Sequence, residues 1–200
     1  KAKEVIYLED DQIAVITRKK LQIKDIDNNN TGYSAEKLLL DLHTIEKKGF
    51  ESFMMKEIHE QPETIADCLR GRLAAAGSEI ALGGIEDQMP RLLRAKKITI
   101  VSCGTSWHSA LIGKFLIESL TRIPVEVDYA SEYRYRRPII NSDDVVVGIT
   151  QSGETADTKA ALELAKSKGA LILGIVNVVG SSIARMAHAG IYTHSGTEIG

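Results

Sequence analysis

Glycines and hydroxyl side chains are concentrated in three short segments of this chain. The segments are residues 102–106 (Ser-Cys-Gly-Thr-Ser), 150–155 (Thr-Gln-Ser-Gly-Glu-Thr) and 177–182 (Asn-Val-Val-Gly-Ser-Ser), and each follows an apolar run. Glycine lets backbone N–H groups approach an anion, and hydroxyls donate further hydrogen bonds to it. A helix that begins at the segment adds its partial positive end. These residue types therefore predict phosphate binding.

The three segments do not carry the same prediction. The first two contain more hydroxyls than the capping of one helix requires, so we expect them to form the phosphate site together. In the third segment, Ser181 or Ser182 is expected only to cap a helix. No lysine or arginine occurs in any of the three, so the predicted site relies on neutral hydrogen-bond donors.

Motifs for several other chemistries are missing from the sequence. GxGxxG follows none of the strand-like runs and GxxxxGK[ST] does not occur, which leaves dinucleotide and triphosphate binding without support. Ser152 does not stand in the GxSxG elbow of hydrolases. Cys103 has only His108 as a basic neighbour, on the next helix, so we expect a buried, unreactive thiol. The histidines show no HxxxH or HExxH spacing, and we predict no metal or other cofactor.

Composition restricts the partners and the compartment. A formal net charge of −2 removes the long-range attraction for nucleic acid, so the arginines beside Tyr135 are expected to be solvated or to face another subunit. Cys68 and Cys103 form no CxxC pattern and suit a reducing compartment. There is no run of 18 apolar residues and no signal peptide at residue 1, so we expect a cytoplasmic protein without membrane contact. A start without methionine and an end without a closing element suggest part of a longer chain.

The first 90 residues differ in character from the rest. Residues 5–25 are expected to form three short strands, too few to bury a core, and 27–32 to form a loop. Helical spacing follows at 34–46 and again from Phe53, with an interruption at Pro62 and a restart behind it. We therefore expect a helical connector over 28–90.

From residue 91 onward, short β-branched runs alternate with helical stretches. The predicted strands are 98–101, 125–127, 145–149, 171–176 and 191–193, and helices are expected at 109–120 and 158–168. This alternation predicts an α/β domain over 91–200, with a doubly wound parallel sheet covered by helices on both faces. Ligands bind such sheets beyond the carboxyl ends of the strands, which is where the three polar segments lie.

The combination of motifs resembles the sugar isomerase (SIS) domain, in the version found in glutamine:fructose-6-phosphate amidotransferases. The signature segments are residues 103–106 and 152–157, and further matches occur at 130–136, 180–182, 196–200 and, in the connector, 55–58 and 60–62. The resemblance implies a flavodoxin-like fold for 91–200, as the first of two SIS domains. It also implies that 1–27 are the closing strands of a glutaminase domain, with the connector at 28–90.

The resemblance further implies a role for the chain. The family converts fructose 6-phosphate and glutamine to glucosamine 6-phosphate and glutamate; glutamine would bind in a domain outside this chain, and a homodimer is expected. The nucleophilic cysteine of the glutaminase domain and the acid–base groups of the second SIS domain are not in these 200 residues. No catalytic residue is therefore named, and the chain alone is expected to be inactive. The implied substrate-binding residues are Cys103, Gly104, Thr105, Ser106, Thr150, Gln151, Ser152 and Thr155.

A second hypothesis is a non-catalytic SIS module that senses a phosphosugar. Such a regulator is expected to carry a basic helix-turn-helix before its SIS domain. Residues 1–90 instead show strands and a connector of mixed charge, so the sequence favours the enzyme.

Overall fold

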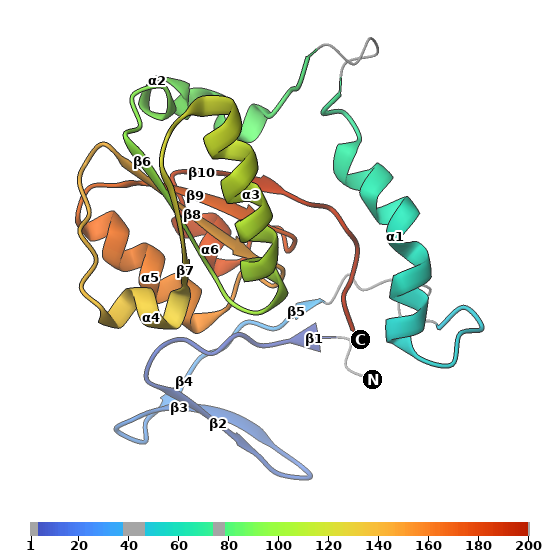
Figure 1. Cartoon of the computed structure of the whole chain (residues 1–200). Helices are drawn as coiled ribbons and strands as arrows, with labels where there is room; N and C mark the ends of the chain where they lie inside the picture. Colours follow the sequence, from blue (N-terminus) through green and yellow to red (C-terminus); the bar gives the residue numbers. More distant parts are fainter. Residues whose placement is uncertain (1–3, 38–46, 74–78, 200) are drawn as a thin grey trace. The chain divides into compact units, whose positions relative to one another are not determined.

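The chain forms two compact units, Lys1–Glu51 and Ser52–Gly200. The computed structural model of the protein, drawn in Figure 1, describes residues 4–37, 47–73 and 79–199. The three-part division at residues 27 and 90 remains a prediction.

The first unit contains short antiparallel strands. Strands β2 (Gln12–Ile16), β3 (Leu21–Asp25) and β4 (Asn30–Thr31) form one sheet in that order, and β1 (Glu4–Val5) pairs with β5 (Glu36–Lys37). The strands predicted within 5–25 are thus present. The loop prediction for 27–32 was incomplete, because the Asp25 carboxylate accepts a hydrogen bond of 2.8 Å from Asn29 N and turns the chain back onto β3.

The helix predicted at 34–46 is wrong at its start, and the rest of it falls at 38–46, outside the described residues. Residues 36 and 37 form β5 instead, because pairing with β1 supplies backbone hydrogen bonds that an isolated first helical turn lacks.

The second unit begins with helix α1 (Phe53–Leu69), which continues through Pro62 without the predicted interruption. Ser52 caps this helix, since its Oγ accepts a hydrogen bond of 3.1 Å from Met55 N. Proline removes one helical hydrogen bond, but its fixed φ near −65° is compatible with a helix, so the turns on either side carry the helix across it. Two short helices follow, η2 (Gly83–Gln88) and α2 (Met89–Leu92).

A five-stranded parallel sheet forms the centre of the second unit. Its strands are β6 (Lys97–Ser102), β7 (Val125–Tyr129), β8 (Asp144–Thr150), β9 (Leu171–Val176) and β10 (Ala189–Tyr192), in the spatial order β10-β9-β8-β6-β7. Numbered from β6, this is the order 2-1-3-4-5 of flavodoxin-like sheets. The predicted doubly wound α/β fold and all five of its strands are therefore confirmed.

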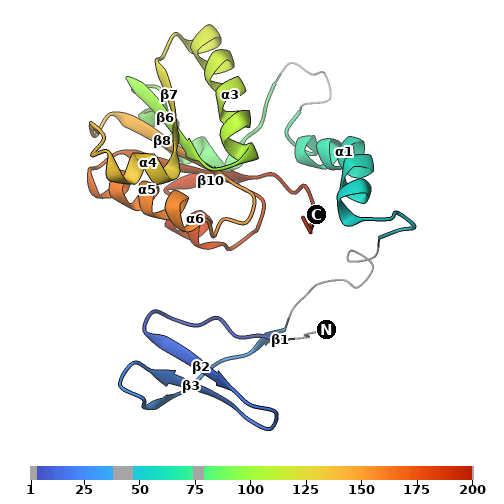
Figure 2. The ribbon, with the colours of Figure 1, turned by 60° about the horizontal axis from the view of Figure 1, so that its bottom comes forward.

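Helices cover both faces of this sheet (Figure 2). Helix α3 (Thr105–Thr121) lies on one face, where Ile100 packs with Ala110 and Val125. The other face carries α4 (Ala130–Tyr135), α5 (Ala156–Ser167) and α6 (Ser182–Met186), which pack on Val101 and Val146. Neighbouring residues of β6 thus point into different cores, as a strand buried on both sides requires.

His188, which precedes β10, is held in its neutral form by this packing. Its ring Nδ1 accepts a hydrogen bond of 3.0 Å from Ile172 N, and the backbone N–H of His188 donates to Ile172 O at 3.0 Å. Partial burial, with the positive charges of Lys166 and Arg91, holds the pKa of His188 below its usual value.

We expect the free energy of unfolding to fall as the pH drops below about 6.5, the ordinary pKa of histidine. The unfolded chain then takes up a proton that the folded chain resists, so stability is lost between this pH and the lower pKa of the folded state. Urea unfolding at pH 7.5 and pH 5.5, followed by the fluorescence of Trp107, measures the effect. His188→Gln should have a weaker pH dependence than the wild type. Equal pH dependence in the two proteins would contradict the prediction.

Candidate functional site

The first two polar segments leave adjacent strands at the same edge of the sheet. Strands β6 and β8 pair in parallel, with Ser102 opposite Ile149, so the segments 103–106 and 150–155 start side by side. The connection after β6 leads to α3 on one face of the sheet, whereas the connection after β8 leads to α5 on the other. Open α/β sheets bind ligands at such a reversal of direction. The structure therefore brings these two predicted segments together.

The first segment depends on the backbone of Gly104. This residue has φ 60° and ψ −136°, a conformation that side chains strongly disfavour, and it stands at the N-cap of α3. No side chain among the described residues caps α3. The first-turn N–H groups of Thr105 and Ser106 therefore face the edge where an anion could bind.

The side chain of Cys103 takes part in the packing of the core. It is half-buried and packs against the core cluster that contains Val101 and Tyr133. This packing agrees with the expected unreactive thiol, and the expected role in lining a pocket remains a prediction.

The second segment is organised around the hydroxyl of Thr150. Thr150 Oγ1 lies 2.9 Å from Thr155 Oγ1 and accepts a hydrogen bond of 3.3 Å from Gly153 N. Ser152 Oγ accepts a hydrogen bond of 3.2 Å from Glu154 N. Thr155 is the N-cap of α5, but its hydroxyl is turned to Thr150, and no described side chain caps the helix. The first turn of α5 therefore also presents N–H groups at this edge.

The third segment does not act as predicted. Ser181 is the N-cap of α6, but its hydroxyl is buried and makes no hydrogen bond within the described part of the chain. The Ser182 hydroxyl does not cap the helix either; the cap is the carboxylate of Glu154, whose Oε1 accepts a hydrogen bond of 2.7 Å from Ser182 N. An acidic residue in an otherwise neutral segment was the only sequence signal for this arrangement.

Asn177, which the sequence analysis did not single out, anchors the segment after β10. Its Oδ1 accepts hydrogen bonds from Thr193 Oγ1 at 2.9 Å and from Ser195 N at 2.8 Å. Its backbone N–H donates to Gln151 O at 3.1 Å. The third segment thus connects the second segment to residues 193–195.

The charges around this edge do not form a basic patch. Arg134 pairs with Asp157 at 3.2 Å, and Arg136 pairs with Asp128 and, at 3.7 Å, with Glu126. Within the ranges that the structure describes, no group of three or more His, Cys, Asp or Glu side chains could hold a metal ion. Across those same ranges, none of the helices combines the length and the apolar character needed to cross a membrane.

Magnitudes limit what this arrangement can do chemically. A hydrogen bond to a charged group contributes about 1.5–3 kcal/mol, whereas association costs about 4–15 kcal/mol. Several donors from both segments must therefore act on the same anion. The arrangement is suited to binding and positioning an anion.

Comparison with known proteins agrees with this geometry. The SIS domain family matches residues 91–200. Curated proteins named isomerizing glutamine–fructose-6-phosphate aminotransferase are similar over 98% of the chain; that of Chlorobaculum tepidum is 56% identical over 197 residues, and that of Bacteroides thetaiotaomicron 55% identical over 198 residues. The chain spans 32% of the length of each.

A solved structure has the same fold. It is the C-terminal domain of glucosamine-fructose-6-phosphate aminotransferase from Francisella tularensis, with a TM-score of 0.71 and 36% sequence identity. The similarity covers 78% of this chain and 43% of that one.

The backbone of Gly104 gives a testable prediction. Gly104→Ala should lower the free energy of unfolding by about 1–3 kcal/mol, because a Cβ would meet no atom within 4 Å and the whole effect comes from the strained backbone. Gly83→Ala is the matched control, since Gly83 also has open space but no positive φ. Urea unfolding followed by Trp107 fluorescence compares them. Equal stability of the two variants would contradict the assigned backbone.

Proposed function

The chain belongs to the SIS domain family, and from this we propose that its segments 103–106 and 150–155 bind the phosphate of fructose 6-phosphate. The chain would do so as part of an enzyme that converts fructose 6-phosphate and glutamine to glucosamine 6-phosphate and glutamate. The observation that carries the proposal is the pairing of β6 with β8, which sets two uncapped helix N-termini and their hydroxyls at one edge. The names of the relatives supply the substrate.

Each segment has a part in this proposal. Hydrogen bonds to the phosphate would come from Ser106 in the first segment and from Thr150, Gln151, Ser152 and Thr155 in the second. Thr105 would lie near the sugar, and Cys103 and Gly104 would line the pocket. Thr150 occupies a position that is often serine in the family, and it keeps the hydroxyl that the role requires.

The reaction itself needs groups outside this chain. Ammonia released from glutamine would replace the carbonyl oxygen of the sugar, and the resulting imine would isomerise to the aldose amine. Holding the phosphate fixes the reacting end against those groups, and such positioning contributes a large part of a rate enhancement. We further propose that 1–27 close a glutaminase domain, that 28–90 connect it to the SIS domain, and that the protein is a cytoplasmic homodimer.

The phosphosugar-sensing hypothesis is less well supported. The similar proteins carry the name of an enzyme, and their similarity covers 98% of this chain. It therefore extends into the first 90 residues, where a regulator would carry a DNA-binding domain.

Titration of the isotope-labelled chain with fructose 6-phosphate tests the substrate. We expect amide shifts at 104–106 and 150–155, larger than those caused by inorganic phosphate, because the sugar adds contacts to the same donors. Fructose without phosphate should cause none. Equal shifts with phosphate and fructose 6-phosphate would reduce the site to an anion cradle, and unshifted amides in the folded protein would refute the proposal.

Ser152→Ala tests one hydroxyl. The loss of one hydrogen bond to a charged phosphate should weaken binding by about 10- to 100-fold. Ser167→Ala is the control, because Ser167 ends α5 at the other edge of the sheet and its hydroxyl only donates to Leu164 O. The dissociation constant for fructose 6-phosphate is measured for both variants. If Ser152→Ala binds as tightly as Ser167→Ala, Ser152 does not contact the phosphate.

A further inference from the structure

We propose that Glu154 is a positioning residue whose carboxylate ties the phosphate segment to the first turn of α6. The inference rests on the proposed function, because it concerns how the same segment is held ready for its ligand. Glu154 itself is assigned no contact with the substrate.

Within the described residues, four hydrogen bonds join the second segment to residues 177–183. Three have backbone acceptors, among them one from Val178 N to Gln151 O at 3.3 Å, and the fourth is accepted by the side chain of Glu154. Gln151 O accepts from Asn177 N at 3.1 Å, and Gly153 O accepts from Ile183 N at 3.0 Å. Glu154 Oε1 then accepts from Ser182 N at 2.7 Å. The carbonyl oxygens of residues 151 and 153 are thereby directed at the third segment, where their partial negative charge is matched by N–H donors. Freed carbonyls would be able to turn toward a phosphate and repel it.

The fit between the two segments leaves no room for adjustment. Gly153 has φ +69°, and a Cβ on it would lie 1.9 Å from Ser181 Oγ and 2.4 Å from Ser181 Cβ. Because the segments touch so closely, the side chain of Glu154 spans directly from one to the other. A shift of Gly153 would also disturb Thr150, whose hydroxyl accepts from Gly153 N, and through it Thr155.

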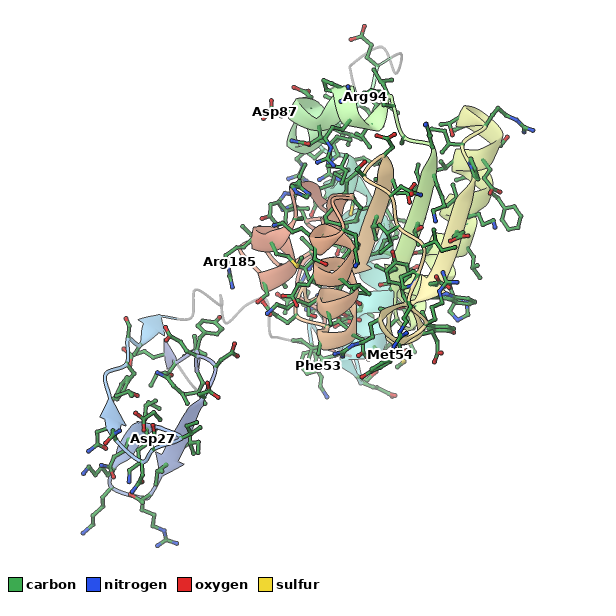
Figure 3. The ribbon with its side chains drawn as sticks, turned by 90° about the vertical axis from the view of Figure 1, so that its left-hand side faces the viewer. Asp27, Phe53, Met54, Asp87, Arg94 and Arg185 are labelled. Carbon is green, nitrogen blue, oxygen red and sulfur yellow. The ribbon has the colours of Figure 1, made fainter. Side chains whose placement is uncertain are left out.

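Positively charged side chains lie near the carboxylate of Glu154. Arg185, labelled in Figure 3, donates to Gly180 O and, at 3.4 Å, to Ser182 Oγ. Partial burial is the largest single effect and disfavours the charged carboxylate, whereas its hydrogen bonds with Ser182 favour it. The positive charges of Arg185 and Lys159 act in the same direction, so the pKa of Glu154 lies below its usual value. The carboxylate is therefore ionised at neutral pH and accepts a hydrogen bond from the first N–H of α6, that of Ser182.

Two substitutions separate the hydrogen bond from the charge. Glu154→Ala removes both, whereas Glu154→Gln keeps an oxygen that can accept from Ser182 N. If Glu154 positions the segment through its hydrogen bond, Glu154→Gln should keep the protection of the Ser182 amide and the affinity for fructose 6-phosphate that Glu154→Ala loses. Glu163→Ala is the matched control, since Glu163 lies on α5, the helix that follows the second segment, and forms an ion pair of 3.9 Å with Lys159.

Two measurements on the complete chain carry the test. The first is the hydrogen-exchange rate of the Ser182 amide without ligand, and the second is the dissociation constant for fructose 6-phosphate. For Glu154→Ala we expect exchange at Ser182 to be at least about tenfold faster and binding to be about tenfold weaker, the effect of losing one such hydrogen bond. Glu154→Gln and Glu163→Ala should remain within about threefold of the wild type in both.

The outcomes are distinct. If Glu154→Ala binds fructose 6-phosphate as tightly as the wild type, the positioning role is overturned and the proposed function stands. The same conclusion follows if Glu154→Ala and Glu154→Gln weaken binding equally. If the wild type does not bind fructose 6-phosphate, the proposed function fails and the ligand role of Glu154 fails with it. That result is separable from failure of the contact itself, because the exchange rate of Ser182 is measured without ligand.

Discussion

The parallel pairing of β6 with β8 is the constraint on which the site depends. With Ser102 opposite Ile149, the two polar segments start at the same height on neighbouring strands. Right-handed connections then carry one segment to α3 and the other to α5, on opposite faces of the sheet. A slip of this register by one residue would move each hydroxyl along the edge and turn the side chains of each core toward the opposite face of the sheet. The packing of both cores therefore also fixes the geometry of the loops.

The site is built from dipoles and not from formal positive charge. Neither segment contains lysine or arginine, and the nearby Arg134 and Arg136 are engaged by acids of α5 and β7. Binding by N–H groups and hydroxyls depends on orientation more than on distance, so the backbone must be fixed in advance. Gly104 and Gly153 give the backbone its special conformations, and the contacts with the third segment hold the second in place.

The sequence predicted the sheet, its five strands and the position of the polar segments well, because strands buried on both faces have a strong and simple pattern. It failed where one interaction outweighed a local preference. Pro62 was expected to interrupt α1, but a single lost hydrogen bond does not end a helix whose neighbouring turns are intact. Ser181 was expected to cap α6, but the cap comes from Glu154, 28 residues away in the sequence, and no local pattern reports such a contact. The roles of the substrate-binding residues came from family resemblance and not from spacing.

The partners β6 and β8 are not neighbours in the sequence, because α3, β7 and α4 lie between them. Closing this long segment of chain costs conformational entropy before any contact between the two strands repays it. The segments 103–106 and 150–155 therefore come together only when the intervening helices and strand have folded. A peptide containing either segment alone would lack the other half of the donors. Ligand binding and the cooperative folding of the sheet are consequently linked, since any ligand held by both segments also stabilises the β6–β8 pair against unfolding.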